Sequence, residues 1–204
     1  GPDYLEGLDH DVIFRTPGLH PRFLEAAVAR GSAVTSEMEV FFDVCPCPIL
    51  AVTGSDGKTT TTTIIARLLQ AAGHTVHLGG NIGRPLLGEA EAIRPGDWAV
   101  VELSSFQLLT MRRSPHIAVL TNLAPNHLDV HTDMEEYVRA KAVLLNYQGP
   151  SDRAVCNWDN EITRRLSQET AGKVSHFTRA SGFKPDRGCW LEGDAVWYRD
   201  EAGA

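Results

Sequence analysis

The arrangement of apolar and polar positions predicts strands that alternate with helices along most of the chain. Short and nearly continuous apolar runs, bounded by polar or glycine-rich segments, are typical of strands that are buried on both faces. Such runs occur at residues 49–52, 75–78, 98–103, 117–122 and 154–157. Together with helical spacing between them, they indicate an α/β fold with a mostly parallel sheet and helices on both faces.

Two helices are predicted between these strands. The first follows Lys58 and ends near Gly73, because a left-handed residue commonly closes a helix. The second covers residues 133–147, with Thr132 as its cap. The first helix is expected to bury an apolar stripe that consists of Ile64, Ile65, Leu68, Leu69 and Ala72.

The first 47 residues show a pattern of their own. It predicts strands at residues 12–14 and 33–35 and helices at residues 21–30 and 37–44. Pro46 and Pro48 then form a stiff linker, because a proline disfavours a helical residue before it. We therefore predict that residues 1–47 are the C-terminal part of one domain and that residues 48–204 are a second domain, incomplete at its C-terminal end. The opening strand of the first domain is absent, so we expect a piece of a longer protein.

Beyond residue 173 the pattern predicts strands alone. Residues 174–177 form one predicted strand, and residues 190–198 form a hairpin that turns at Gly193 and Asp194.

Composition excludes several classes of protein. The chain has 204 residues, of which 43% are hydrophobic and 22% are charged, as in ordinary globular proteins. A net charge of −7 argues against a general nucleic-acid binder. No apolar run reaches the length of a membrane span, and the acidic N-terminal stretch is unlike a signal peptide. We therefore expect a cytoplasmic protein that binds neither nucleic acid nor membranes.

The four cysteines do not predict a metal site. Cys45 and Cys47 form a C-x-C pair instead of the C-x-x-C spacing of a zinc knuckle, and Cys156 and Cys189 stand alone. We expect all of them to be reduced and structural.

The segment after the strand at residues 49–52 has the layout of a phosphate-binding loop. Glycines let backbone N–H groups face an anion, and the following helix directs the positive end of its dipole to the same place. Lys58 is expected to reach the β- and γ-phosphates of a nucleotide, and Thr59 to ligate Mg²⁺. The longer common motif has a further glycine where this chain has Val52. An ordinary strand–turn–helix is the alternative.

Polar residues follow several of the predicted strands. Because the carboxyl ends of parallel strands meet at one edge of a sheet, Asn81, Glu102 and Asn122 should lie near the loop. A buried carboxylate needs a partner, so Glu102 is interpreted as a second ligand of the Mg²⁺ that Thr59 holds. A surface glutamate at a strand end is the alternative.

His127 and Lys141 allow more than one interpretation. His127 and His131, with Asp129 between them, suggest a zinc site, but a nearby Mg²⁺ site and the lack of a third soft ligand disfavour it. Lys141 lies in a predicted helix among apolar residues. From the pattern alone it is interpreted as a solvated, structural lysine.

Five strings, taken in order, resemble the Mur ligases of peptidoglycan synthesis: TGSDGKTT, GGNIG, VELSSFQL, TNLAPNHLDVH and EYVRAKAVLL. ELSSFQL is most similar to the branch that adds D-glutamate to UDP-N-acetylmuramoyl-L-alanine. The resemblance implies a P-loop, ATP-binding central domain, preceded by part of a Rossmann-like domain that binds the UDP substrate. It also accounts for the short loop, because Mur ligases use TG-x-x-GK-[ST].

The resemblance further implies roles for individual residues. ATP would be bound by Gly54, Ser55, Asp56, Gly57, Lys58, Thr59 and Thr60. The catalytic residues would be Lys58, Glu102, His127 and Lys141. Thr59 and Glu102 would ligate one Mg²⁺, whereas Lys141, once carbamylated, would hold a second Mg²⁺ together with His127. The muramoyl-alanine substrate would be contacted by Asn81, Ser104 and Gln107, and its diphosphate by Gly18.

The implied reaction joins D-glutamate to the substrate carboxylate. The γ-phosphoryl group of ATP would form an acyl phosphate, which the amine of D-glutamate then attacks, leaving ADP and phosphate. The protein would be a monomer. Because the part that binds D-glutamate is not in this sequence, we expect the chain alone to bind nucleotide weakly and not to turn over. The alternatives are another P-loop ligase or NTPase, including the folylpolyglutamate type, and an inactive nucleotide-binding fragment.

Overall fold

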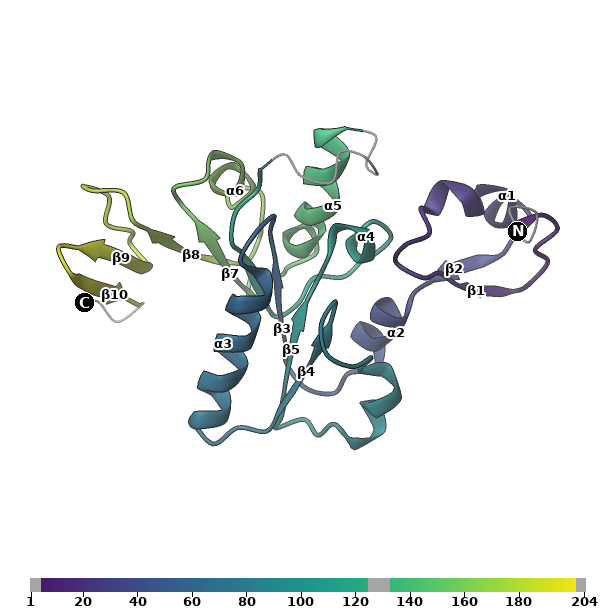
Figure 1. Cartoon of the computed structure of the whole chain (residues 1–204), viewed down its shortest axis with the longest axis horizontal. Coiled ribbons are helices and arrows are strands. Elements are labelled where there is room, and N and C mark those ends of the chain that lie inside the picture. The colour runs from purple at the N-terminus through teal and green to yellow at the C-terminus, as the bar shows by residue number, and fades with distance from the viewer. Residues whose placement is uncertain (1–4, 125–132, 201–204) are drawn as a thin grey trace.

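A large sheet forms the centre of the computed structural model, which describes residues 5–124 and 133–200 (Figure 1). The sheet has eight strands in the order β10-β9-β8-β7-β6-β3-β5-β4. Its strands are β3 (Ile49–Thr53), β4 (Val76–Gly80), β5 (Trp98–Glu102), β6 (Ile117–Leu120), β7 (Arg153–Asn157), β8 (Lys173–Thr178), β9 (Gly188–Glu192) and β10 (Ala195–Arg199). Neighbouring strands are parallel throughout, except that β9 and β10 are antiparallel. The predicted mostly parallel sheet is confirmed.

Helices cover both faces of this sheet. On one face, α3 (Lys58–Ala71) buries Ala66 against Val52 and Val100. The opposite face carries the larger apolar core, to which α2 (Glu37–Val44), α5 (Met134–Asn146) and α6 (Glu161–Leu166) contribute buried side chains. Every residue of β3 is buried, because the strand lies inside the sheet and both of its faces are covered.

The register of the parallel strands brings their carboxyl ends together. Val52 of β3 and Gly80 of β4 both pair with Glu102, the last residue of β5. Thr53 pairs with Leu120, the last residue of β6. The loops that leave β3, β4, β5 and β6 therefore begin at one edge of the sheet, where a ligand of an α/β protein is expected to bind.

The buried face of α3 differs from the predicted stripe. Thr62 and Ala66 are fully buried, whereas Ile64 and Leu68 are 51% and 64% exposed. A buried threonine is tolerated here because the Thr62 hydroxyl donates a 2.8 Å hydrogen bond to the carbonyl oxygen of Lys58. The prediction that Ile64 and Leu68 face the sheet is wrong.

The predicted cap of α5 is also corrected. The helix begins at Met134, and its N-cap is Asp133, whose carboxylate accepts a 2.7 Å hydrogen bond from the backbone N–H of Glu136. Asp133 therefore takes the role that the sequence assigned to Thr132. Shorter helices escaped prediction, namely η3 (Leu87–Ala92), α4 (Ser105–Leu108) and α6.

A small two-stranded sheet precedes the large one. The predicted strands β1 (Val12–Phe14) and β2 (Ala33–Thr35) are confirmed and pair in parallel. The helix predicted between them is instead a 3-10 turn, η2 (Pro21–Leu24), followed by one turn of α1 (Glu25–Ala29). The predicted helix at residues 37–44 is α2, and its Met38 and Phe41 side chains belong to the core of the large sheet. A domain boundary at residue 47 stays a prediction.

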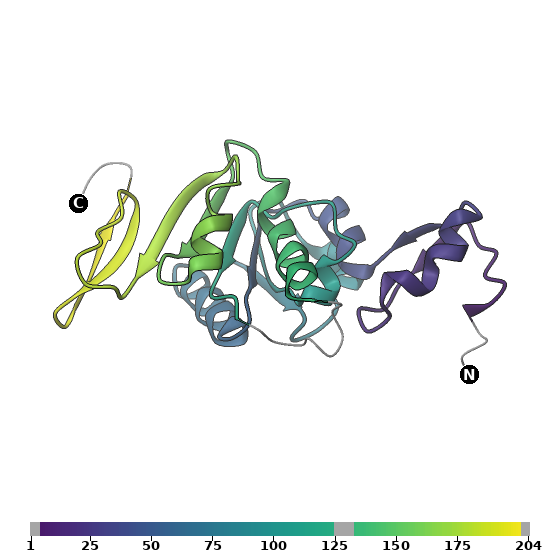
Figure 2. The same cartoon turned by 90° about the horizontal axis from the view of Figure 1, so that it is seen from above.

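The predicted hairpin lies at the opposite end of the molecule from the small sheet (Figure 2). Gly193, between β9 and β10, has a positive φ of 60°, as a tight hairpin turn requires. The outer strand β10 leaves Val196, Trp197 and Tyr198 exposed. Within residues 5–124 and 133–200, no helix combines the length and the apolar character that a membrane span needs.

Candidate active site

The loop from Gly54 to Gly57 joins β3 to α3, and the backbone at its two glycines favours glycine over other residues. A Cβ atom at Gly54 would overlap the hydroxyl of Thr121 at the end of β6. Gly57 has a φ of 76° and is the N-cap of α3, but it has no side chain to bond the first N–H groups of the helix. Those N–H groups are therefore available to an anion, as they are in phosphate-binding loops.

Side chains of the loop fix it to neighbouring elements. The Ser55 hydroxyl lies 2.9 Å from the hydroxyl of Tyr137 and accepts a 2.9 Å hydrogen bond from the backbone N–H of Ala124. The backbone N–H of Asp56 donates to the Asn122 side chain, and the Thr121 hydroxyl donates to the Asp56 carbonyl oxygen. The Ser55 side chain therefore anchors the loop to α5, whereas Asp56 remains exposed.

Lys58 bends back over the loop that it follows. Its Nζ donates a 3.0 Å hydrogen bond to the carbonyl oxygen of Ser55. This contact holds the ammonium group beside the backbone that the glycines expose. A cation at this place balances the charge of a bound phosphate without a covalent bond.

Glu102 is the centre of a second cluster at the sheet edge. It is 2% exposed, and its Oε2 accepts a 2.6 Å hydrogen bond from the hydroxyl of Thr59. Its Oε1 accepts a 2.8 Å hydrogen bond from the side-chain amide of Asn81. Both of these hydrogen-bond donors are neutral groups. The prediction that Asn81, Glu102 and Asn122 lie near the loop is confirmed, because Asn81 and Thr59 both bond Glu102 and the Asn122 side chain bonds Asp56 of the loop.

This oxygen cluster fits a hard cation. Hydroxyl and carboxylate oxygens are the ligands that Mg²⁺ takes from proteins, usually together with phosphate oxygens of a nucleotide. Among the residues that the structure describes, no group of three or more His, Cys, Asp or Glu side chains gathers to hold a metal.

Lys141 is buried below the loop, contrary to the solvated position that its pattern indicates. It is 2% exposed, and its Nζ donates a 3.1 Å hydrogen bond to the hydroxyl of Thr53. The same Nζ lies 4.9 Å from the centre of the Tyr137 ring. Burial, reinforced by the charge of Lys58 and opposed by that of Glu102, lowers the pKa of Lys141 to about 7. A large fraction of this amine is therefore neutral near pH 7.

The residues assigned to the muramoyl-alanine substrate lie in two places. Ser104 and Gln107 form a capping box at the start of α4, in which each side chain bonds the other's backbone N–H. Gly18 lies in a turn closed by a 3.0 Å hydrogen bond from the N–H of Leu19 to the carbonyl oxygen of Thr16. His127 lies outside the described residues, as do His131 and Asp129 of the zinc alternative.

Arg15 connects these two places, although no sequence pattern indicated such a role for it. Its guanidinium donates hydrogen bonds to the carbonyl oxygens of Thr16, Pro17 and Leu19 in the turn that contains Gly18. The same group bonds the carbonyl oxygen of Phe106 in α4 and the hydroxyl of Thr110 just after that helix. Tyr137 was also missed, but its position one turn before Lys141 on α5 could have indicated that both face the loop.

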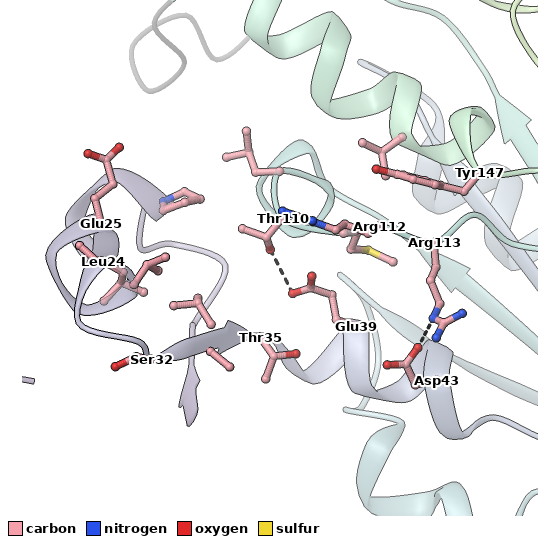
Figure 3. A pocket seen from close by; sticks show the side chains of 18 residues that line it. Leu24, Glu25, Ser32, Thr35, Glu39, Asp43, Thr110, Arg112, Arg113 and Tyr147 are labelled. Atoms are coloured by element: carbon pink, nitrogen blue, oxygen red, sulfur yellow. Dashed lines mark hydrogen bonds and ion pairs between the residues drawn. The ribbon is translucent and has the colours of Figure 1, made fainter. Parts of the chain in front are cut away.

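A cavity of about 1180 Å³ lies apart from this cluster, between the small sheet and the segment at residues 109–113 (Figure 3). Thr110 donates to Glu39 at 3.0 Å along its wall, and Arg113 pairs with Asp43. None of the predicted site residues that the structure describes lines it. We place the candidate site at the sheet edge, because the phosphate loop and the perturbed Lys141 are there.

Comparison with known proteins decides the family. Residues 52–194 match the family model described as the Mur ligase middle domain. The chain belongs to the Mur ligase family. The resemblance that the sequence strings carried is therefore confirmed, and the match covers the loop, the strand ends and α5.

Relatives of known name span much more sequence than this chain. The UDP-N-acetylmuramoylalanine--D-glutamate ligase of Acetivibrio thermocellus is 52% identical over 204 residues, which are 98% of this chain and 43% of that protein. The ligase of the same name from Symbiobacterium thermophilum is 48% identical over 95% of this chain and 45% of its own length. The chain thus spans less than half of the length of these Mur ligases.

Solved structures support the fold. The ligase titled UDP-N-acetylmuramate:L-alanyl-gamma-D-glutamyl-meso-diaminopimelate ligase, from Neisseria meningitides, aligns with a TM-score of 0.61 at 19% identity, covering 97% of this chain and 67% of that one. MurF from Acinetobacter baumannii aligns with a TM-score of 0.58 at 17% identity, covering 93% and 48%. The predicted α/β Mur ligase fold is confirmed.

Proposed function

We propose that this chain supplies the nucleotide-binding part of an ATP-dependent ligase that adds D-glutamate to UDP-N-acetylmuramoyl-L-alanine in cytoplasmic peptidoglycan precursor synthesis. The names of relatives at about 50% identity support this substrate pair. Because the chain spans less than half of their length, turnover is proposed for a protein of the relatives' full length. The chain alone is expected to bind nucleotide weakly, as a monomer, without turnover.

The observation that carries the proposal is the buried Lys141 beside the phosphate loop. A P-loop kinase or NTPase needs the loop, the helix terminus and the Lys58 cation. The chemistry of a P-loop kinase or NTPase does not call for a second lysine such as Lys141, whose pKa is lowered to about 7 by burial. Perturbed groups of this kind concentrate at functional sites, and this one lies at the edge where Thr59 and Glu102 meet.

In the proposed reaction, an oxygen of the substrate carboxylate attacks the γ-phosphorus of ATP, and ADP leaves. The amine of D-glutamate then attacks the carbonyl carbon of the acyl phosphate, loses a proton and expels phosphate. Residues 54–60 bind the ATP phosphates through backbone N–H groups, and Lys58 neutralises their charge. These groups act by position and electrostatics, which supply most of the catalysis of phosphoryl transfer.

Thr59 and Glu102 are the residues that would hold a Mg²⁺ ion with the ATP phosphates. Such an ion supplies charge neutralisation on the phosphate oxygens. Asn81 donates to Glu102 and so fixes the direction of its carboxylate. Asn81 itself, Ser104 and Gln107 are proposed to contact the muramoyl-alanine substrate, with Gly18 near its diphosphate.

Lys141 is proposed to carry a carbamate. The neutral amine attacks the carbon of CO₂ and releases one proton, so that the side chain becomes an anion. The lowered pKa favours this step, because the neutral amine is the nucleophile. The carbamate and His127 would then face a second Mg²⁺. As an anion near Lys58, the carbamate also removes the repulsion between two cationic lysines.

The phosphate loop is tested by isothermal titration of the chain with a non-hydrolysable ATP analogue and Mg²⁺. Loss of a charge-assisted contact predicts that Lys58→Ala weakens binding by roughly tenfold or more. Lys184→Ala is the matched control, because Lys184 lies in an exposed ion pair with Glu192. Equal binding by the Lys58→Ala variant and the unchanged chain would contradict the role of the loop.

The carbamate is tested without an activity measurement. After incubation with ¹³C-bicarbonate, the unchanged chain should give a protein-bound carbamate carbonyl resonance that Lys141→Met lacks.

In a protein of full length, phosphate release should require both UDP-N-acetylmuramoyl-L-alanine and D-glutamate. Undiminished phosphate release without D-glutamate would favour an NTPase over the proposed ligase.

A further inference from the structure

Cys45 and Cys47 form a pair of thiols that the proposed ligase reaction does not use. Their Sγ atoms lie 3.6 Å apart, in the connection between α2 and β3. Cys45 is half-buried, whereas Cys47 is 2% exposed and packs into the core of the large sheet. Both are free thiols.

The local backbone explains why the two sulfur atoms are close. Cys45 has an extended conformation, with φ −65° and ψ 118°, which is what the proline after it favours. Side chains at positions i and i+2 of an extended segment point to the same side. The two thiols lie on the same side of this proline-containing connection, as their Sγ separation of 3.6 Å shows.

The segment on either side of the pair is held in place. The backbone N–H of Cys45 bonds the carbonyl oxygen of Phe41 at the end of α2. The carbonyl oxygen of Pro48 accepts from Ala99, and the N–H of Ile49 donates to the ring of His116. An S–S bond of about 2.05 Å is shorter than the present separation of 3.6 Å, so closure requires the two sulfur atoms to approach each other within this fixed segment.

We propose that Cys45 and Cys47 are a reversible redox site, which a small disulfide such as glutathione disulfide converts to an intramolecular disulfide. The Cys45 thiolate attacks one sulfur of glutathione disulfide and releases one glutathione. The Cys47 sulfur, on losing its proton, then attacks the Cys45 sulfur of the mixed disulfide and releases the second glutathione. Two thiols are oxidised and one disulfide is reduced to two thiols, so electrons and protons balance.

The order of attack follows from the surroundings of each thiol. Burial, and then the neighbouring Cys45, raise the pKa of the Cys47 thiol to about 12. The thiolate is the nucleophile, so the half-buried Cys45 is the thiol that reacts first. The disulfide would close a ring across only three residues. A loop that short gives little chain-entropy stabilisation, which distinguishes this pair from a structural cross-link.

The test uses the folded chain, treated with glutathione disulfide, blocked with an alkylating reagent and digested with trypsin. Residues 31–57 contain no lysine or arginine, so both cysteines fall in the peptide of residues 31–58, separate from Cys156 and Cys189. We expect this peptide to lose the mass of two hydrogen atoms and to carry no glutathione. Treatment with dithiothreitol should restore both thiols.

Variants that lack one of the two cysteines separate the accessibility of Cys45 from the closure of the disulfide. Cys47→Ser cannot close the disulfide, so its Cys45 should retain one glutathione, and the extent of this adduct measures the accessibility of Cys45. In Cys45→Ser, the buried Cys47 should stay a thiol. The proposal is overturned if the unchanged peptide remains a dithiol, carries glutathione on either cysteine, or is linked to Cys156 or Cys189. Circular dichroism of each variant confirms that the thiols are compared in folded chains.

Discussion

Lys141 is held in surroundings that disfavour its charge. It is 2% exposed, its hydrogen bond goes to the neutral hydroxyl of Thr53, and the ammonium of Lys58 adds repulsion. The carboxylate of Glu102 compensates only in part, because the net shift of the Lys141 pKa is downward. The chain therefore loses stability at this position, as is common where a site is arranged for chemistry.

We predict that Lys141→Met stabilises the chain at pH 7 and that this advantage disappears toward pH 10. In the folded chain Lys141 has a pKa of about 7, against an ordinary value of 10.5. Between these values the unfolded chain binds a proton that the folded chain does not, so the free energy of unfolding rises with pH. The slope is at most about 1.4 kcal/mol per pH unit.

Urea denaturation of both chains across this pH range, in buffer free of CO₂, measures the difference. The penalty is fully present below about pH 7 and is lost as both states become neutral near pH 10.5. Lys184→Met serves as the control, because Lys184 is an exposed lysine. Parallel pH profiles for Lys141→Met and the unchanged chain would show that the burial of Lys141 does not govern its protonation.

Site residues that belong to one continuous motif could be predicted from the sequence. Site residues that depend on contacts between distant parts of the chain could not. The positions of Gly54 and Lys58 between β3 and α3 follow from a strand–loop–helix pattern that is continuous in sequence. The Ser55 hydroxyl faces Tyr137, which is 82 positions away, and Arg15 bonds Phe106 across 91 positions. No short-range pattern encodes such pairs, because they depend on how β3, α4 and α5 pack.

Helix α5 places two side chains of the site through a single element. Tyr137 and Lys141 are four residues apart, so they lie on the same face, toward the phosphate loop. The position of that face depends on where the helix begins. Asp133 fixes the start by accepting a hydrogen bond from the N–H of Glu136.

We predict that Asp133→Ala lowers the free energy of unfolding by about 1 kcal/mol, because the first turn of α5 loses its cap. Equilibrium denaturation with urea measures this value. Glu135→Ala is the matched control on the same turn. It removes an exposed pair with Arg139, which should cost only about 0.3–0.5 kcal/mol. Equal losses in the two variants would mean that the cap contributes no more than a surface ion pair.

Helix α3 shows why element type was predictable and orientation was not. Its boundaries follow from Lys58 and Gly73, but its rotation does not follow from its apolar stripe. The Gly54–Gly57 loop is fixed to Thr121, Asn122 and Tyr137, so the helix must leave the loop in one direction. That direction turns Thr62 inward, where its hydroxyl is satisfied within the helix, and leaves Ile64 exposed.

Side-chain contacts, in addition to the continuous backbone, connect the small sheet to the large sheet. Helix α2 leads from β2 into the large sheet and buries Met38 and Phe41 there. Arg15 adds a second connection, since one guanidinium bonds both the turn after β1 and helix α4. Burial lowers the pKa of Arg15, with the charge of Glu39 opposing this effect. The position of the turn that contains Gly18 therefore depends on one buried cation.

We predict that Arg15→Lys loosens the small sheet while leaving the large sheet intact. A single ammonium cannot reproduce the planar fork that bonds Leu19 and Phe106 from separate nitrogen atoms. Loss of buried, charged hydrogen bonds typically costs about 1–3 kcal/mol, so amides of residues 12–35 should exchange roughly tenfold faster or more. Hydrogen exchange followed by mass spectrometry measures this region separately from β3 to β7.

Arg22→Lys is the control for this prediction, because Arg22 is an exposed arginine of the same unit that stacks on Phe23. It should leave the exchange of residues 12–35 nearly unchanged. If Arg15→Lys also left that exchange unchanged, α2 alone would hold the small sheet. If exchange rose equally in β3 to β7, Arg15 would stabilise the whole fold, and the two sheets would open as one cooperative unit. Faster exchange confined to residues 12–35 would show that Arg15 fixes the turn near Gly18 against helix α4.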